Sequence, residues 1–151
     1  MGLALREAAR ALEQGEVPVG AVMVSAGSVI ARSHNQVRML RDPTAHAEML
    51  AITQASAALE NERLRTVTLY VSLEPCAMCA GALVLSRVDR VVYGAADRKA
   101  GACGSVFDIL ADPRLNHRPV VRAGVGAAAA AAMLTEFFQS RRQLRGPVVE
   151  S

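Results

Sequence analysis

Four side chains that can bind a metal or transfer a proton lie in two short segments. His46 and Glu48 are two residues apart in "DPTAHAEML", and Cys76 and Cys79 are three apart in "EPCAMC". Two thiolates and a neutral imidazole supply three of the four ligands of a tetrahedral zinc site, and catalytic sites keep the fourth position for water. A carboxylate beside that water can take its proton. The segments predict a catalytic zinc site with His46, Cys76 and Cys79 as ligands and Glu48 as the proton carrier.

Both segments are predicted to lie at helix starts. Thr44 follows Asp42 and Pro43, so it is the expected cap of a helix over 45–59, and a proline opens a second helix over 74–87. The positive end of the second helix would stabilise both thiolates. Residues two apart in a regular helix point in nearly opposite directions. His46 and Glu48 are therefore expected to converge only if the metal lies at the mouth of the helix, where side chains are less radial.

The remaining elements alternate between helix and strand patterns. We expect two strands within 17–36, with Pro18 at the start of the first and a turn at Ala26 and Gly27. Further helices are expected over 2–14 and 126–145, further strands over 67–73, 89–94 and 119–125, and a glycine-rich loop over 94–105. Strands separated by helices favour a three-layer α/β sandwich with a mixed sheet. No linker-like segment interrupts the chain, so residues 1–151 are expected to form a single domain.

Composition limits the possible classes of protein. The chain has 151 residues, of which 52% are hydrophobic and 21% charged, which is typical of one globular domain and not of disorder. Its net charge is +3, with Lys99 the only lysine beside sixteen arginines, so contacts to phosphate are possible. No stretch is long and apolar enough to span a membrane, and the N-terminus lacks a signal-peptide pattern. Three cysteines argue against a disulfide framework. We expect a cytoplasmic protein without a membrane partner.

The two segments and their flanks resemble a known family. "HAE" followed by "PCAMC" resembles the signature of zinc-dependent nucleoside and nucleobase deaminases, and this resemblance implies an acid–base role for the glutamate. "GEVPVGAV", "LYVSLEPCAMCAGA", "GSVFDIL" and "FFQSRR" narrow the resemblance to the bacterial tRNA adenosine deaminases, between about Gly15 and Arg142. A lone H-x-E or C-x-x-C would be weak, whereas their combination in this order is specific.

The resemblance implies a fold, an activity and partners. It implies the cytidine-deaminase-like fold, with α/β/α layers around a mixed five-stranded sheet, one zinc per subunit and a homodimer. The implied substrate is the wobble adenosine of a tRNA anticodon stem-loop, with no DNA partner. In the implied reaction, zinc-activated water attacks C6 of adenine. Glu48 protonates N1 and then the departing amine, which releases ammonia and leaves inosine.

The resemblance also implies five substrate-binding residues. Asn35 matches a residue that hydrogen-bonds the target base, and Asp97 and Lys99 match the loop that holds the sugar and phosphate of the flipped nucleotide. Arg141 and Arg142 match the basic end of the last helix, which contacts RNA. From the residues alone, Asn35 could equally bond to nearby backbone. The two arginines could equally complement the C-terminal end of their helix.

Two other function classes share these motifs. A deaminase of a free nucleobase or nucleoside, such as guanine or cytosine, would keep the zinc site and change only the pocket and surface. A non-enzymatic zinc module would close the fourth position with Cys103 or His34, but such a site needs no Glu48. Loop cysteines and histidines more often pack or face solvent than bind metals, so Cys103, His34 and His117 are not assigned to the site.

Overall fold

The computed structural model describes residues 1–146; residues 147–151, part of the expected single domain, lie outside the described residues. A five-stranded sheet has the order β2-β1-β3-β4-β5. Its strands are β1 (Gly20–Ser25), β2 (Ser28–His34), β3 (Val67–Leu73), β4 (Arg90–Ala95) and β5 (Val120–Arg122). β1 runs antiparallel to β2 and β3, whereas β3, β4 and β5 are parallel. The expected mixed sheet is confirmed.

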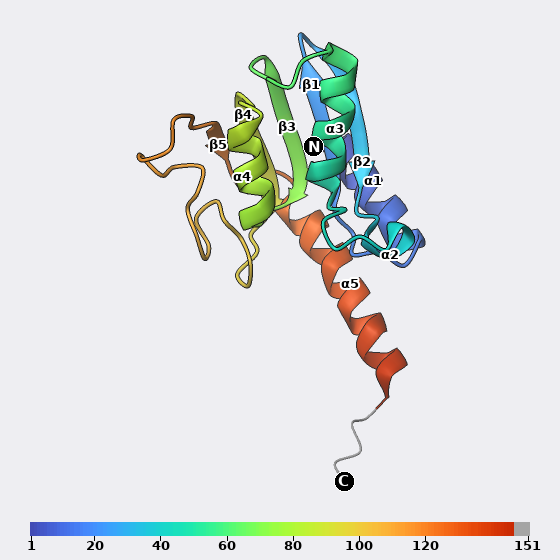
Figure 1. Cartoon of the computed structure of the whole chain (residues 1–151). Helices are drawn as coiled ribbons and strands as arrows, with labels where there is room; N and C mark the ends of the chain where they lie inside the picture. Colours follow the sequence, from blue (N-terminus) through green and yellow to red (C-terminus); the bar gives the residue numbers. More distant parts are fainter. Residues whose placement is uncertain (147–151) are drawn as a thin grey trace.

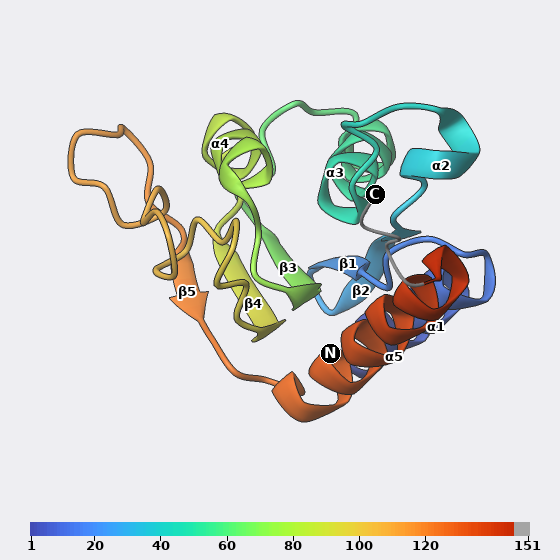
Figure 2. The same ribbon diagram turned by 90° about the horizontal axis from the view of Figure 1, so that it is seen from below.

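Helices cover both faces of this sheet. Figure 2 shows α3 (Ala47–Leu59) and α4 (Ala77–Leu85) on one face, and α1 (Gly2–Glu13) and α5 (Ala127–Arg145) on the other. The expected three-layer α/β arrangement is confirmed. A four-residue helix α2 (Val37–Leu40), which the sequence pattern did not indicate, joins β2 to the segment before α3. None of the described helices is long and apolar enough to cross a membrane.

The turn between β1 and β2 has the expected residues. Ala26 and Gly27 both have positive φ, of 50° and 77°, which is the backbone geometry of a two-residue hairpin turn. Pro18, however, does not begin β1. The N–H of Val19 donates locally to the carbonyl of Val17, so strand pairing begins only at Gly20.

Two helices begin later than expected. Thr44 is not the cap of α3, because its N–H and its hydroxyl both bond to Asp42 Oδ1, at 2.8 and 2.7 Å, in a local turn. The residue before α3 is His46, and the residue before α4 is Cys76. Both residues have extended backbone conformations, so they stand outside the helices that follow them.

Apolar side chains form the core between the sheet and the helices. Met23, Leu69, Val71 and Val91 of the sheet are fully buried, together with Leu83 of α4. β3 and the N-termini of α3 and α4 point to the same end of the molecule (Figure 1). That end therefore gathers the segments that carry His46, Glu48 and the two neighbouring cysteines.

Candidate active site

The three expected zinc ligands lie together. His46 Nδ1 is 3.6 Å from Cys76 Sγ and 3.5 Å from Cys79 Sγ, and the three ligand atoms lie within 4.8 Å of one another. Nitrogen and sulfur ligands at zinc bond lengths of about 2.0–2.3 Å are separated by about 3.5 Å in a tetrahedron. The donor set and its spacing therefore fit zinc.

The position of His46 removes the difficulty raised by its spacing to Glu48. His46 precedes α3 with φ −73° and ψ 151°, so its ring is not constrained to the radial direction of a helical side chain. Glu48 lies in the first turn of α3 and is 4% exposed. Cys76 precedes α4 in the same way, and Cys79 is buried in the first turn of that helix. Two helix N-termini thus converge on the cluster, and both favour negative charge.

The groups of the cluster shift one another's pKa values. The hydrogen bond from Cys79 lowers the pKa of Cys76 to about 3, while the same contact and burial raise the pKa of Cys79. The lowered pKa of Cys76 favours the thiolate, which is the form in which cysteine binds a metal. Burial raises the pKa of Glu48, against the opposing effect of Cys79. A carboxyl group with a raised pKa can hold a proton between two transfer steps.

A pocket of about 280 Å³ opens over this cluster. Its lining includes His46, Glu48 and Cys76, together with Asn35 and Asp97 from the expected substrate-binding set. The remaining lining residues are Glu16, Val17, Val19, Val37, Arg38, Leu73, Glu74 and Ala100. The pocket combines apolar side chains with polar and charged ones, as small-ligand sites do.

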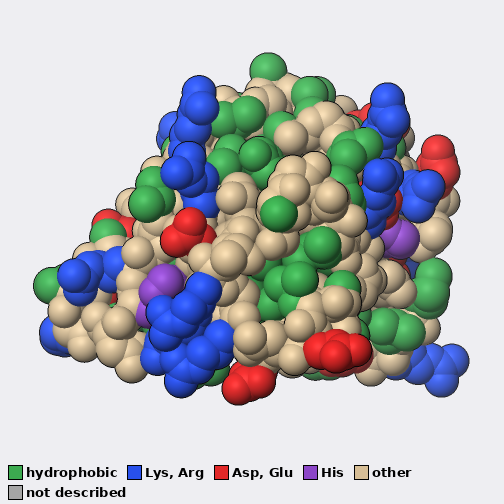
Figure 3. Space-filling model, turned by 90° about the horizontal axis from the view of Figure 1, so that it is seen from above, with side chains coloured by type: hydrophobic (Ala, Val, Ile, Leu, Met, Phe, Trp, Pro, Cys, Tyr) green, Lys and Arg blue, Asp and Glu red, His purple; other side chains and the backbone are tan. Residues whose placement is uncertain are grey.

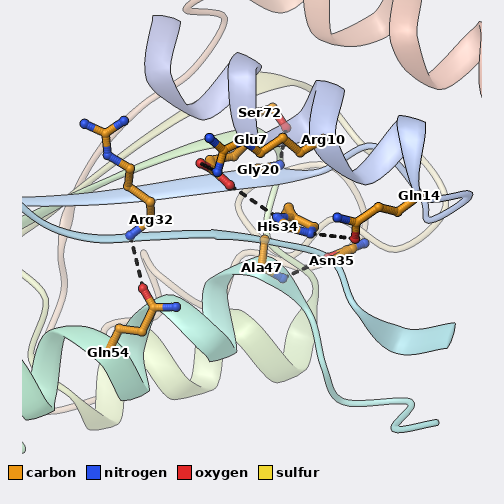
Figure 4. Close-up of polar contacts among 10 residues, drawn as sticks. All are labelled: Glu7, Arg10, Gln14, Gly20, Arg32, His34, Asn35, Ala47, Gln54 and Ser72. Atoms are coloured by element: carbon orange, nitrogen blue, oxygen red, sulfur yellow. Dashed lines mark hydrogen bonds and ion pairs between the residues drawn. The ribbon is translucent and has the colours of Figure 1, made fainter. Parts of the chain in front are cut away.

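Asn35 bonds to backbone and also faces the pocket. Its Oδ1 accepts the N–H of Ala47 at 2.8 Å, which satisfies the first amide of α3 (Figure 4). The side-chain amide nitrogen donates no hydrogen bond among the described residues, so it is the part of Asn35 available to a ligand. Asn35 thus makes the backbone contact that the sequence left open, and its amide nitrogen stays free to donate to a ligand.

The loop after β4 is held by Glu74, which the sequence analysis did not assign. Glu74 Oε1 accepts the N–H of Asp97 at 3.1 Å and the Ser105 hydroxyl, and Oε2 accepts the N–H groups of Cys103 and Ser105 at 3.0 and 3.2 Å. A side chain at Gly101 would collide with this carboxylate. Burial raises the pKa of Glu74, but the hydrogen bonds from Ser105, Cys103 and Asp97 lower it below its usual value. The segment "SLEPC" contained the only sequence signal, a polar residue directly after an apolar strand.

Asp97 and Lys99 occupy this loop in different ways. Asp97 Oδ1 accepts the N–H groups of Lys99 and Ala100, at 3.1 and 3.2 Å, which fixes the turn. Asp97 lines the pocket, whereas the exposed Lys99 lines a neighbouring groove. The two residues were expected to act together, and the structure places them on adjacent surfaces.

A second hollow of about 590 Å³ adjoins the pocket and is strongly basic. We call it the basic groove; it is lined by Arg38, Lys99, Phe137, Phe138, Arg141, Arg142 and Arg145. Arg38 lines both the groove and the pocket. The C-terminal half of α5, which carries much of the groove, extends beyond the sheet in Figure 1. On the opposite end of the molecule, basic side chains form separate groups with acidic and apolar side chains between them (Figure 3).

Arg141 and Arg142 differ in their surroundings. Arg141 Nη2 donates to the carbonyl of Gly15 at 2.6 Å, and its guanidinium lies 5.1 Å from the centre of the Phe137 ring. Arg142 is exposed and lies in the last turn of α5, where it also complements the negative end of the helix. Only Arg142 of this pair is free of a protein contact among the described residues.

The unassigned residues lie outside the metal cluster. His34 is held between Glu7 and Gln14, with ring nitrogens 3.2 and 3.0 Å from their oxygens (Figure 4). His117 Nε2 lies 2.7 Å from the carbonyl of Val88. Cys103 is not among the clustered ligand atoms. Neither residue considered for a closed fourth position is therefore part of the cluster.

This cluster, within a three-layer fold of this topology, defines a deaminase of the cytidine-deaminase-like class. A family model of MafB19-like deaminases matches residues 1–142. The tRNA-specific adenosine deaminase of Aquifex aeolicus is 52% identical over 140 residues, covering 93% of this chain and 92% of that protein. The enzyme of the same name from Bacillus subtilis is 49% identical, with 93% and 87% covered. The chain belongs to the family of tRNA-specific adenosine deaminases.

Solved structures are similar along most of the chain. One, from studies of A-to-I editing by tRNA:A34 deaminases at the wobble position of transfer RNA, superposes with a TM-score of 0.86 at 48% identity, covering 89% of this chain and 97% of that one. The guanine deaminase from Nitrosomonas europaea superposes with a TM-score of 0.75 at 29% identity, covering 90% and 81%. The fold is thus shared with both a tRNA-editing and a free-base enzyme.

Proposed function

We propose that the protein hydrolytically deaminates adenosine to inosine at the wobble position of a tRNA anticodon stem-loop. The observation that carries this proposal is the 52% identity to a tRNA-specific adenosine deaminase over almost the whole length of both chains. The basic groove beside the pocket supports it, because a polyanionic substrate requires cations outside the reaction centre. We further propose that residues 1–151 act as one cytoplasmic domain.

The proposed reaction uses the residues of the pocket. His46, Cys76 and Cys79 would hold one zinc per subunit, which when bound supplies activation of water at neutral pH. Glu48 would take the proton of the attacking water and deliver it to N1 of adenine. Attack of the water oxygen at C6 forms the C–O bond, and Glu48 would then carry the proton of the new hydroxyl to the amino group, so that the C–N bond breaks and adenosine and water give inosine and ammonia.

The pocket residues would orient the base and the loop. The free amide nitrogen of Asn35 is a donor for an acceptor on the edge of the flipped base. Asp97 faces the pocket, where it would contact the sugar of the same nucleotide, and Lys99 faces the groove and its phosphates. Arg142 would contact the RNA backbone. These contacts would position the loop, while the zinc site carries out the chemistry.

A second candidate, deamination of a free base, is favoured by the similarity to guanine deaminase. The deciding experiment incubates the purified protein with tRNA transcripts and, separately, with guanine, cytosine and adenosine, and measures inosine and ammonia. We expect inosine in the anticodon loop and no comparable turnover of free compounds. Faster turnover of guanine or cytosine than of RNA would instead assign the protein to the free-base class.

We also propose a homodimer. Leu85, at the end of α4, is 80% exposed, and Val106 and Phe107, in the loop after β4, are 48% and 54% exposed. Apolar side chains of this size on the α4 side of the molecule would be covered by a second copy. None of these three residues lines the basic groove, which would stay open to RNA.

A further inference from the structure

The cation that connects the pocket to the basic groove has no assigned role. We propose that Arg38, paired with Arg141, binds a backbone phosphate next to the target nucleotide. This inference rests on the proposed function, because it names the part of the RNA substrate that this surface takes.

Arg38 is at the boundary of the two hollows. Among the described residues, it is the one that lines both the pocket of about 280 Å³ and the groove of about 590 Å³. A nucleotide chain with its flipped base in the pocket and its backbone in the basic groove would cross this boundary. The first groups of the substrate to pass Arg38 are therefore the sugar and phosphate of the target nucleotide or of its neighbour.

Arg38 and Arg141 are held against the same oxygen atom. Arg38 Nη1 and Arg141 Nη2 both donate to the carbonyl of Gly15, at 3.1 and 2.6 Å. Gly15 has φ of +74°, which turns the chain sharply after α1 and is costly for a residue with a side chain. The left-handed turn at Gly15 thus presents one acceptor to two guanidinium groups.

The charge of this pair is not balanced by an acid. Among the described residues, neither Arg38 nor Arg141 forms an ion pair. The carboxylate of Glu16, the residue after Gly15, accepts the backbone N–H groups of Arg38 and Met39, at 3.1 and 2.8 Å. Two like charges so close together repel each other, and an anion between them removes that cost.

The remaining donors suit a phosphate. Each guanidinium has five N–H donors, and the protein uses only one side-chain donor of Arg38 among the described contacts. The forked geometry of arginine matches phosphate oxygens. Glu16 fixes the backbone from which Arg38 projects, so the guanidinium is presented by an ordered segment although its side chain is exposed. The arrangement is a prepared two-arginine site for a phosphodiester.

The test compares Arg38→Gln and Arg38→Lys with Arg32→Gln, which removes an exposed arginine of β2 that lines neither hollow. Binding of an anticodon stem-loop RNA is measured from 50 to 200 mM salt. Arg38→Gln should weaken binding about five-fold, as expected for one partly exposed ion pair, and reduce the logarithmic salt slope by about 0.7. Arg38→Lys should keep the slope, and Arg32→Gln should change neither quantity.

RNA with uncharged linkages beside the target adenosine shows which phosphate Arg38 contacts. Methylphosphonate linkages on either side of the target adenosine should weaken binding to the parent protein and abolish the difference between the parent and Arg38→Gln. An unchanged salt slope in Arg38→Gln, or an equal loss of affinity on charged and neutral RNA, would overturn the proposal. If the parent protein deaminates free guanine and not RNA, the proposed function is wrong. The anion site is then tested separately, by adding pyrophosphate to the parent protein and recording its NMR spectrum. Pyrophosphate should shift the Arg38 Nε–Hε resonance, and no shift rejects the site as well.

Discussion

His46 and Cys76 occupy equivalent positions, each as the last residue before a helix. Because their backbones are extended, the ring and the first sulfur reach across the space between α3 and α4. The second residue of α3 then brings the Glu48 carboxyl to the same point from within the helix. His46 and Glu48 can therefore face the same site although they are only two residues apart, because His46 lies before the helix and Glu48 lies within it.

Replacing Glu48 separates metal binding from proton transfer. Glu48→Gln keeps the size of the buried side chain, so we expect an unchanged fold and an unchanged content of one zinc per subunit. Deamination should fall by about 10²- to 10⁴-fold, the typical contribution of general acid–base catalysis. Zinc is measured by elemental analysis and turnover as inosine formation. Glu62→Gln, in an exposed loop, is the matched control; near-parental activity of Glu48→Gln would exclude its role.

The oxygen and the nitrogen of the Asn35 side-chain amide can be tested separately. Asn35→Asp keeps an oxygen that can accept the Ala47 N–H but replaces the free amide donor. We expect near-parental thermal stability with turnover lowered about ten-fold, as for the loss of one hydrogen bond. Asn35→Ala also removes the acceptor and should cost about 1 kcal/mol of folding free energy. Thermal melts and single-turnover rates separate the effects. If Asn35→Asp turns over RNA like the parent, Asn35 only supports α3.

At the scale of elements, the loop after β4 is attached to the segment that carries Cys76. The N–H of Ala102 donates to the carbonyl of Pro75 at 2.8 Å, and Cys76 pairs with Gly101 in an isolated bridge. Glu74 adds its side-chain bonds to the same loop. The loop that presents Asp97 is therefore fixed to the metal-binding segment.

Glu74→Gln should loosen this loop. An amide cannot accept all four donors, and leaving a buried N–H unsatisfied costs about 1–3 kcal/mol. We expect a higher KM for RNA, a smaller change in kcat and unchanged zinc content. Hydrogen exchange should increase at Asp97, Cys103 and Ser105 and stay unchanged in α3. An equal loss of kcat with unchanged KM would contradict a positioning role.

The same variant predicts a pH dependence. Because the folded pKa of Glu74 is below its ordinary value of 4.5, the carboxylate contributes stability above that pH, and the contribution is lost as the pH falls through the folded pKa. The difference in unfolding free energy between the parent and Glu74→Gln should therefore be largest near neutral pH and decrease in acid. Denaturant titrations at several pH values measure it, and a difference independent of pH would contradict the assignment.

For the whole molecule, the arrangement of charge and apolar surface predicts a dimer that leaves the groove open. Leu85→Ser with Phe107→Ser should shift the protein toward monomer in sedimentation equilibrium, because both exposed side chains would leave an apolar interface. Leu144→Ser, at the equally exposed end of α5, is the control and should leave the assembly unchanged. A monomeric parent would disprove the proposed homodimer.

Local pattern was sufficient for much of the molecule. β3 runs over Val67–Leu73 as expected, and the limits of α1, β4 and α5 differ from expectation by one residue at most, because the composition of each segment differs clearly from that of its flanks. The sequence also predicted His46, Cys76 and Cys79 as ligands and Glu48 as the proton carrier, and the structure brings the three ligand atoms together and places Glu48 in the lining of the same pocket. The start of α3 did not follow, because Thr44 had a competing local partner in Asp42. The start of α4 did not follow either, because the N–H of Glu74 donates to Ala95 and Cys76 pairs with Gly101, both distant in sequence.

Tertiary structure alone decided which distant groups share a space. Nothing in local sequence joins Gly15, Arg38 and Arg141, which are far apart along the chain and meet at one carbonyl. Glu74 likewise acquires its role only when the loop after β4 folds back over it. Residue type and spacing determine what chemistry a segment can perform. The tertiary fold determines which groups from distant parts of the chain face that segment. Contacts between residues far apart in sequence cannot be predicted from local hydrophobic periodicity.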